Sequence, residues 1–180
     1  MNLVTSETSV GSLWQGVVKN AEDRCSVALK TELEAYLVSL LIRYTNKPEV
    51  AKQVFATAFL KAMQLRDRER DTSLQHVGDQ CLLFAGLFPH SAAKRHVKIA
   101  YFVDIGRSAY GAISRKANDL FGSLAIQFVV LMDVLQSIPE HSELLPLEAY
   151  DQWNELGSQR ALQALNEYSN VHIFPIKGLK

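Results

Sequence analysis

The segment from His76 to His90 carries the pair of residues in this chain that is best suited to acid–base chemistry. His76 and Asp79 lie three residues apart in His-Val-Gly-Asp-Gln-Cys-Leu-Leu-Phe-Ala-Gly-Leu-Phe-Pro-His. On a helix this spacing places both side chains on one face, where an imidazole and a carboxylate could transfer a proton or hold a ligand. The rest of the segment is almost wholly apolar, so the alternative is a buried polar contact inside a helical core.

A second helical segment offers polar groups at the same kind of spacing. Tyr101 and Asp104 lie on one side of it, and Arg107 follows one turn after Asp104. A carboxylate that is buried without partners is strongly unfavourable, so Asp79 or Asp104 would need donors if it were buried. The donors that these two segments offer are His76, Tyr101, Arg107 and Tyr110.

Two interpretations of these polar residues remain open. In the first, the residues line a pocket for a small-molecule ligand. In the second, they form a hydrogen-bond network that fixes two central helices in register. The chain has no nucleophile motif and no phosphate-binding loop, which favours the network and predicts no catalytic residue. If the residues instead line a pocket, the protein could be a small-molecule enzyme that uses His76, Asp79 and Asp104, either with or without a metal ion.

Known metal-binding and redox motifs are missing from the sequence. None of the five histidines follows a glutamate by three residues, as the di-iron carboxylate bundles require, and His-Glu-x-x-His does not occur. Cys25 and Cys81 belong to no Cys-x-x-Cys pair. Burial of Cys81 on its apolar helix face would raise the pKa of the thiol and make it inert. We therefore expect no metal site, no cofactor and two buried free thiols.

Three glycines interrupt the segments that hold the polar residues. Gly78, Gly86 and Gly106 are expected inside helices, where a glycine is about 1 kcal/mol less favourable than alanine. A glycine that is kept at this cost indicates close packing, and we expect another backbone to pass near each of them. These three positions are therefore predicted to be helix-packing residues.

Helical periodicity dominates the chain from residue 31 to about residue 168, and no alternating strand pattern appears there. The fold class is therefore predicted to be all-α. We expect a single-domain bundle of about six to seven helices at residues 9–168, with a flexible N-terminus at 1–8. Residues 169–180 are expected to form an extended apolar tail, because Pro175 is incompatible with a helix interior.

Capping patterns predict where some helices begin and end. Thr31-x-x-Glu34 is a capping box, and it predicts a helix from Thr31 to about Asn46. Thr72-x-x-Gln75 predicts the start of the helix that holds His76, so the alternating charges at 66–71 are assigned to a helix end and connector. One helix is expected from Asn118 or Asp119 to Ile138, and a last helical region with a break at Gly157.

Three blocks of the sequence are similar to those of a group of uncharacterised bacterial all-helical proteins. The blocks are Tyr36-Leu-Val-Ser-Leu-Leu41, His76-Val-Gly-Asp-Gln-Cys-Leu-Leu-Phe-Ala-Gly-Leu-Phe-Pro89 and Tyr101-Phe-Val-Asp-Ile-Gly-Arg-Ser-Ala-Tyr-Gly111. The group shares a Gly-Asp…Leu-Phe…Gly-x-Phe block and a Tyr…Gly-x-x-Ala-Tyr block, and the similarity covers residues 31–111. It implies a bacterial cytoplasmic helical domain and no assigned activity. It marks Gly78, Asp79, Gly86, Gly106 and Tyr110 as the family-like positions.

Composition limits the classes of partner. The 180 residues are 48% hydrophobic, and 19 basic residues balance 19 acidic ones. A chain without net charge lacks the field that gathers nucleic acid, so we expect no nucleic-acid partner. The most apolar window, 120–135, is shorter than the span of about 20 residues that a bilayer requires, so we expect no membrane insertion. Unpaired cysteines and a start without signal-peptide features indicate the cytoplasm.

The function that these observations favour is a non-catalytic, homo-oligomeric binding or regulatory protein, in its simplest form a homodimer. The apolar tail either folds back along a groove or docks on a second subunit or protein partner. A small-molecule ligand at the polar cluster also remains open.

Overall fold

The computed structural model describes residues 3–46, 54–90, 97–116, 118–139 and 143–169, although the side chains of residues 3–9 and 169 are not described. Every regular element in these ranges is an α-helix, which confirms the all-α class. The described ranges contain nine helices, where the sequence predicted six to seven. They are α1 (Leu3–Arg24), α2 (Thr31–Asn46), α3 (Phe55–Gln64), α4 (Asp67–Leu87), α6 (Ile99–Ile113), α7 (Leu120–Ile126), α8 (Phe128–Gln136), α9 (Pro146–Leu156) and α10 (Gln159–Ser169).

The additional helices arise from local breaks. The segment expected as one helix up to Ile138 divides at Gln127 into α7 and α8, and Asp119 is the N-cap of α7. The last helical region divides at Gly157, as predicted, where a φ of +69° ends α9. Helix α1 begins at Leu3, inside the segment that the sequence assigned to a flexible N-terminus.

Helix α4 begins earlier than the sequence indicated. It starts at Asp67, so the charged residues 67–71 form its first turns and are not a connector. The predicted capping box is wrong because the Thr72 hydroxyl donates to the carbonyl oxygen of Arg68 at 2.8 Å, an interaction made inside a helix. The helix predicted over 31–46 is confirmed by α2.

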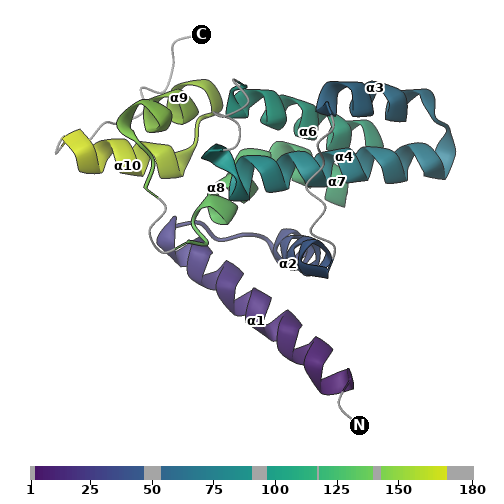
Figure 1. Ribbon diagram of the computed structural model, residues 1–180, viewed down its shortest axis with the longest axis horizontal. Coiled ribbons are helices and arrows are strands. Elements are labelled where there is room, and N and C mark those ends of the chain that lie inside the picture. The colour runs from purple at the N-terminus through teal and green to yellow at the C-terminus, as the bar shows by residue number, and fades with distance from the viewer. Residues whose placement is uncertain (1–2, 47–53, 91–96, 117, 140–142, 170–180) are drawn as a thin grey trace.

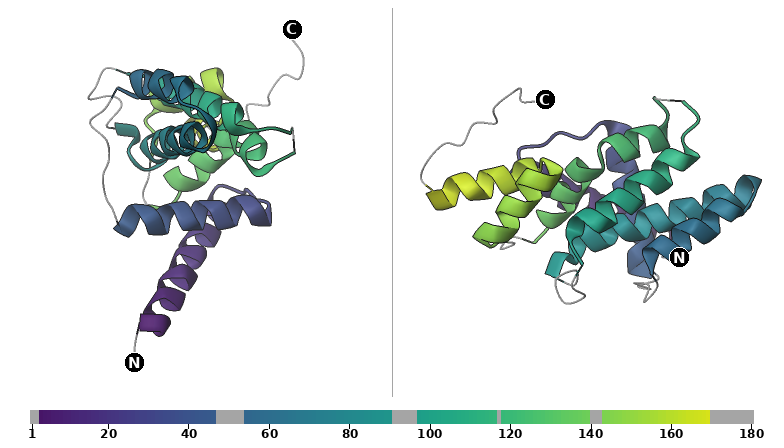
Figure 2. Two further views of the ribbon diagram at one scale, coloured as in Figure 1. Left: turned by 90° about the vertical axis from the view of Figure 1, so that its right-hand side faces the viewer. Right: turned by 90° about the horizontal axis from the view of Figure 1, so that it is seen from above.

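Helix α4 is the centre of the bundle. Every residue from Val77 to Gly86 is buried. Helices α3, α6 and α8 pack against it, with α7 beyond α6, and Figure 1 shows α3, α4, α6 and α7 grouped at one end of the molecule. The α9–α10 pair lies at the other end. The left view of Figure 2 shows α2 along one side of this group, with α1 running away from it.

The glycines of the central helices lie against side chains of neighbouring helices. A Cβ atom at Gly78 would lie 2.6 Å from the ring of Tyr110, and one at Gly86 would lie 2.4 Å from Leu135. A Cβ atom at Gly106 would lie 2.4 Å from the ring of Phe128. The close approach at these positions is therefore made by large side chains, and not by a passing backbone as the sequence had suggested.

The second half of helix α1 packs against the bundle. Val18 and Ala21 are buried there, against α2 and α8. The first half runs away from the other helices, as Figures 1 and 2 show. Along that half the side chain of Leu13 is 66% exposed. One helix therefore serves both as part of the core and as a projection from it.

The hairpin of α9 and α10 has a small apolar cluster of its own, formed by Leu144, Ala149 and Ala161. A polar joint ties the hairpin to α8. The carboxylate of Asp133 accepts a hydrogen bond of 2.6 Å from the Ser158 hydroxyl, which precedes α10. The predicted apolar tail, 169–180, lies outside the residues whose side chains are described, and its docking stays a prediction.

The structure bears on the expectations for the cysteines and for membrane-spanning helices. Cys25 and Cys81 are both free and buried, as predicted, and burial raises the pKa of the Cys81 thiol. Among the helices described, none is both long and apolar enough to cross a membrane.

Candidate functional site

The carboxylate of Asp79 lies at the meeting point of three helices. Its Oδ1 atom accepts hydrogen bonds from the Tyr36 hydroxyl of α2 at 2.5 Å and from the Tyr110 hydroxyl of α6 at 2.7 Å. Its Oδ2 atom lies 3.2 Å from a guanidinium nitrogen of Arg43. Asp79 is only 4% exposed, so these groups replace the water that the carboxylate loses on burial. We call Asp79, Tyr36, Tyr110 and Arg43 the Asp79 network.

The Asp79 network reaches the surface on two sides. The side chain of Arg43 is 49% exposed, and its guanidinium lies 5.8 Å from the centre of the Tyr36 ring. On the other side, Gln75 donates a hydrogen bond of 3.1 Å to the Tyr36 hydroxyl. The Tyr36 hydroxyl therefore accepts from one residue and donates to another, which fixes the direction of the chain from Gln75 to Asp79.

Burial dominates the electrostatics of the network. It raises the pKa of the Asp79 carboxyl, while the hydrogen bonds from Tyr36 and Tyr110 and the charge of Arg43 oppose that rise. Burial and the neighbouring carboxylate raise the pKa of both tyrosine hydroxyls, so the phenols remain proton donors. This arrangement is that of a hydrogen-bonded carboxylate held in place, and not that of a base open to a substrate.

The structure brings together only part of the candidate site that the sequence predicted. Asp79 and Tyr110 are in direct contact, whereas Asp104 and Arg107 lie on the exposed face of α6. His76 is exposed, and the described residues contain no hydrogen bond between it and Asp79. The Tyr101 hydroxyl points elsewhere, because it accepts a hydrogen bond of 3.2 Å from a backbone N–H at the start of α3.

Sequence reasoning missed Tyr36, Arg43 and Gln75. For Tyr36 a signal was present, because it falls on the same helical face as the buried residues Leu33 and Leu40. A tyrosine on an apolar face needs a partner for its hydroxyl, and a buried aspartate is a good one. No such signal marks Arg43, which extends from an otherwise exposed position.

A pocket of about 320 Å³ lies next to the network, between the first turns of α4, the end of α6 and α7. We call it the α4–α7 pocket. Its lining residues are Asp67, Arg68, Asp71, Thr72, Gln75, Ile113, Arg115 and Phe121. Gln75 belongs to both the pocket and the hydrogen-bond chain, and the Phe121 ring packs 6.4 Å from the Tyr36 ring. The pocket therefore shares a wall with the buried network.

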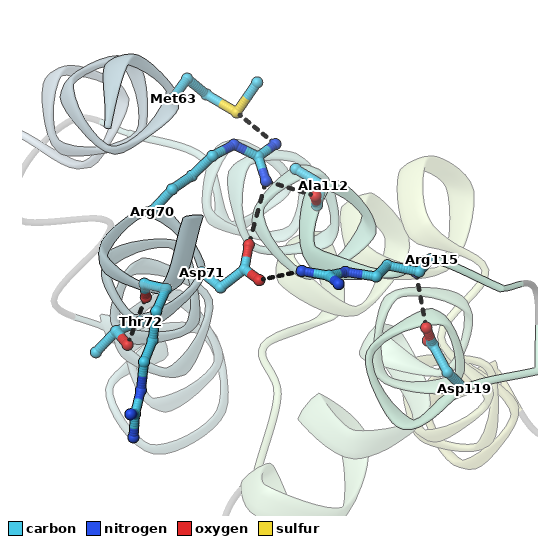
Figure 3. Close-up of polar contacts among 8 residues, drawn as sticks. Met63, Arg70, Asp71, Thr72, Ala112, Arg115 and Asp119 are labelled. Atoms are coloured by element: carbon cyan, nitrogen blue, oxygen red, sulfur yellow. Dashed lines mark hydrogen bonds and ion pairs between the residues drawn. The ribbon is translucent and has the colours of Figure 1, made fainter. Parts of the chain in front are cut away.

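Two residues that line this pocket, Asp71 and Arg115, belong to a chain of ion pairs drawn in Figure 3. The Asp71 carboxylate lies 3.2 Å from Arg70 and 3.2 Å from Arg115, which joins α4 to the segment after α6. Arg70 also donates to the carbonyl oxygen of Ala112 at 3.1 Å. Asp119 accepts a backbone hydrogen bond of 2.8 Å from Arg115, so the turn that carries this arginine is itself fixed.

Two other pockets are lined largely by residues from elsewhere in the described chain. One, of about 250 Å³, lies between the start of α6 and α9, and one, of about 450 Å³, lies beside α10. Neither shares a described lining residue with the α4–α7 pocket. The described ranges hold no group of three or more His, Cys, Asp or Glu residues arranged to bind a metal ion.

Comparisons with known proteins give no assignment. No protein-family model matches the chain, and neither a curated protein nor a solved structure matches it significantly.

Proposed function

We propose that this chain is a non-catalytic, homo-oligomeric binding or regulatory protein, and that two copies associate through the first half of α1. The observation that carries the proposal is an apolar side of this helix that the described residues leave exposed. Leu13 is 66% exposed and Val10 is 38% exposed, although the helix continues into the core at Val18. The Asp79 network has a structural part in this proposal, because it fixes α2, α4 and α6 relative to one another.

The projecting half of α1 is not stabilised by packing against other described helices. Helices shorter than about 12–15 residues are marginally stable in water on their own. Gly11 in this half and Gly16 just after it disfavour the helix further, and among the described residues no atom of another element lies within 4 Å of where their Cβ atoms would be. Gly78, Gly86 and Gly106 are explained by close packing within one copy, whereas Gly11 and Gly16 are not. A partner against α1 would explain both the glycines and the exposed leucine.

A second copy of the same chain suits this surface. Symmetric homodimers are the commonest soluble oligomers, and in them the same patch lies on both sides of the interface. The chain has no net charge, so electrostatic repulsion does not oppose self-association. The similarity of residues 31–111 to uncharacterised bacterial helical proteins, together with the two free thiols, supports a bacterial cytoplasmic setting.

The enzyme alternative receives no comparable support. His76 and Asp104 are exposed, whereas Asp79 is buried and already bound by two hydroxyls and a guanidinium. Exposed apolar residues such as Leu147 and Tyr150 on α9 offer a second surface for contact between copies.

Light scattering coupled to gel filtration tests the proposal. The wild-type chain is expected to elute as a dimer, and the Leu13→Asp variant is expected to elute as a monomer with unchanged helical content. Leu60→Asp is the matched control, because Leu60 is 60% exposed on α3 and lies on a different surface. A wild-type monomer at concentrations up to the millimolar range, or a dimer that survives Leu13→Asp, would contradict the proposal.

A further inference from the structure

We propose that the α4–α7 pocket binds a small zwitterion, namely a free amino acid with an aromatic or branched apolar side chain. The inference goes beyond self-association, and it rests on surfaces that the α1 proposal does not use. Its starting point is the placement of opposite charges and apolar groups around one pocket.

Asp67 and Arg68 provide the two charges. Both line the pocket, and within the described part of the chain neither side chain has a hydrogen-bond or ion-pair partner. The other charged lining residues, Asp71 and Arg115, are already engaged in ion pairs, because the Asp71 carboxylate lies 3.2 Å from both Arg70 and Arg115. A carboxylate and a guanidinium that line one pocket are complementary to a molecule with one ammonium and one carboxylate group. A ligand with a single charge would leave one of the two side chains without a partner.

The backbone holds Asp67 in an unusual position. Its φ angle is +50°, a region that asparagine and aspartate tolerate better than most other residues. The residue before it, Arg66, is extended and provides no side-chain cap for α4. Asp67 is the first residue of α4, and it lines the pocket.

The remaining lining residues suit the rest of an amino acid. Ile113 is 8% exposed and, with the partly buried ring of Phe121, provides an apolar wall. Thr72 and Gln75 add polar groups between this wall and the charged pair. The volume of about 320 Å³ is at the lower end of the range of about 300–1,000 Å³ for small-molecule sites, which favours a ligand of amino-acid size.

The position of Gln75 connects the pocket to the core. Its amide donates to Tyr36, which in turn donates to Asp79. A ligand that contacts Gln75 would therefore change the environment of the Tyr36 hydroxyl, and resonances of α2 should respond although α2 does not line the pocket. This response is the readout that separates binding in the α4–α7 pocket from binding on a remote surface.

The test is a titration of the ¹⁵N-labelled full chain with three probes. L-Phenylalanine carries both charges, 2-phenylethylamine carries only the ammonium group, and 3-phenylpropanoate carries only the carboxylate. We expect L-phenylalanine to shift the resonances of Thr72, Gln75, Phe121 and Tyr36. We expect each analogue to bind about two- to fivefold more weakly, because it forms one exposed ion pair where L-phenylalanine forms two.

Two variants test whether the carboxylate of Asp67 and the guanidinium of Arg68 contact the ligand. Asp67→Asn keeps the tolerance for positive φ and removes the carboxylate, and Arg68→Gln removes the guanidinium. Each is expected to weaken binding of L-phenylalanine about two- to fivefold. Glu69→Gln, an exposed control outside the pocket lining, is expected to leave binding unchanged.

Three results would overturn the proposal. The first is a titration without shifts at these residues up to the solubility limit of the amino acid. The second is equal binding of an analogue with one charge. The third is an effect of Asp67→Asn and Arg68→Gln no larger than that of Glu69→Gln. The comparison of the three probes on the wild-type chain decides the matter even if a variant folds poorly.

Discussion

The Tyr110 hydroxyl donates a hydrogen bond of 2.7 Å to Asp79, while the ring of Tyr110 fills the space that a side chain at position 78 would need. One side chain of α6 thus explains two adjacent residues of α4. Gly78 is required because the ring lies close, and Asp79 is satisfied because the hydroxyl lies beyond it. The Gly-Asp pair is therefore a packing and hydrogen-bonding unit, and this arrangement ties the two central helices together.

Tyr110→Phe is expected to destabilise the protein by about 1.5–3 kcal/mol, the usual value of a hydrogen bond to a charged group. The substitution keeps the ring against Gly78 and removes only the donor to Asp79. Urea unfolding followed by circular dichroism measures the effect. Tyr150→Phe is the control, because Tyr150 is 49% exposed and packs beside Trp153. An equal effect of the two substitutions would contradict the role given to Tyr110.

Gly106→Ala and Gly111→Ala are expected to change stability in opposite directions, although both lie in α6. A Cβ atom at position 106 would lie 2.4 Å from Phe128, so the core must shift at a cost of about 1–3 kcal/mol. Position 111 is exposed and open, so alanine should stabilise the helix by about 0.5–1 kcal/mol. Thermal melting distinguishes the two, and destabilisation by both would contradict this account.

The sequence predicted the all-α class because apolar residues recur at helical spacing in almost every segment. It also indicated the importance of Gly78, Asp79 and Tyr110, but it could not provide the partners of Asp79. Tyr36 lies 43 residues and Tyr110 31 residues away from it along the chain. Which helices meet is a property of tertiary packing, and a single sequence contains no direct record of it.

The expectation for Asp104 illustrates a different difficulty. Asp79 and Asp104 both occur among apolar residues, and the pattern alone suggested that both might be buried. The buried residues of α6, among them Phe102, Gly106 and Tyr110, define a face that leaves Asp104 and Arg107 exposed. Helix α4, in contrast, is buried on all sides from Val77 to Gly86, so its aspartate has no exposed side to occupy.

Asp119→Ala is expected to lower the melting temperature and to loosen the rim of the α4–α7 pocket. The Asp119 carboxylate accepts hydrogen bonds from the backbone N–H groups of Gly122 at 2.7 Å and Arg115 at 2.8 Å. These bonds lower the pKa of the carboxyl to about 2, so their stabilisation is present above pH 4 and is lost as the pH falls towards 2. Asp119→Asn, which can still cap α7, should retain more stability than alanine. Equal melting temperatures for the two variants would contradict a capping role.

The contribution of Asp133 to the free energy of unfolding is expected to increase as the pH falls, whereas that of Asp119 decreases. Burial raises the pKa of its carboxyl to about 6 from 3.8, although Ser158 and the backbone of Arg160 provide hydrogen bonds. The folded state therefore holds this proton more tightly than the unfolded chain does. The free energy of unfolding should rise as the pH falls through 6 and level off near 4, by up to about 3 kcal/mol for a shift of two pKa units.

Asp133→Asn removes the titrating group. The two oxygens of Asp133 accept one hydrogen bond each, from the Ser158 hydroxyl and from the backbone N–H of Arg160, whereas asparagine keeps one acceptor oxygen. Urea unfolding between pH 7.5 and 4 should give a smaller slope for the variant than for the wild-type chain. Burial also raises the pKa of Asp79, so part of the slope should remain in the variant. The nearby Cys25 thiol has a pKa raised above its usual value of 9, so it does not titrate in this window. Identical slopes for the two proteins would show that Asp133 titrates alike in the folded and unfolded states.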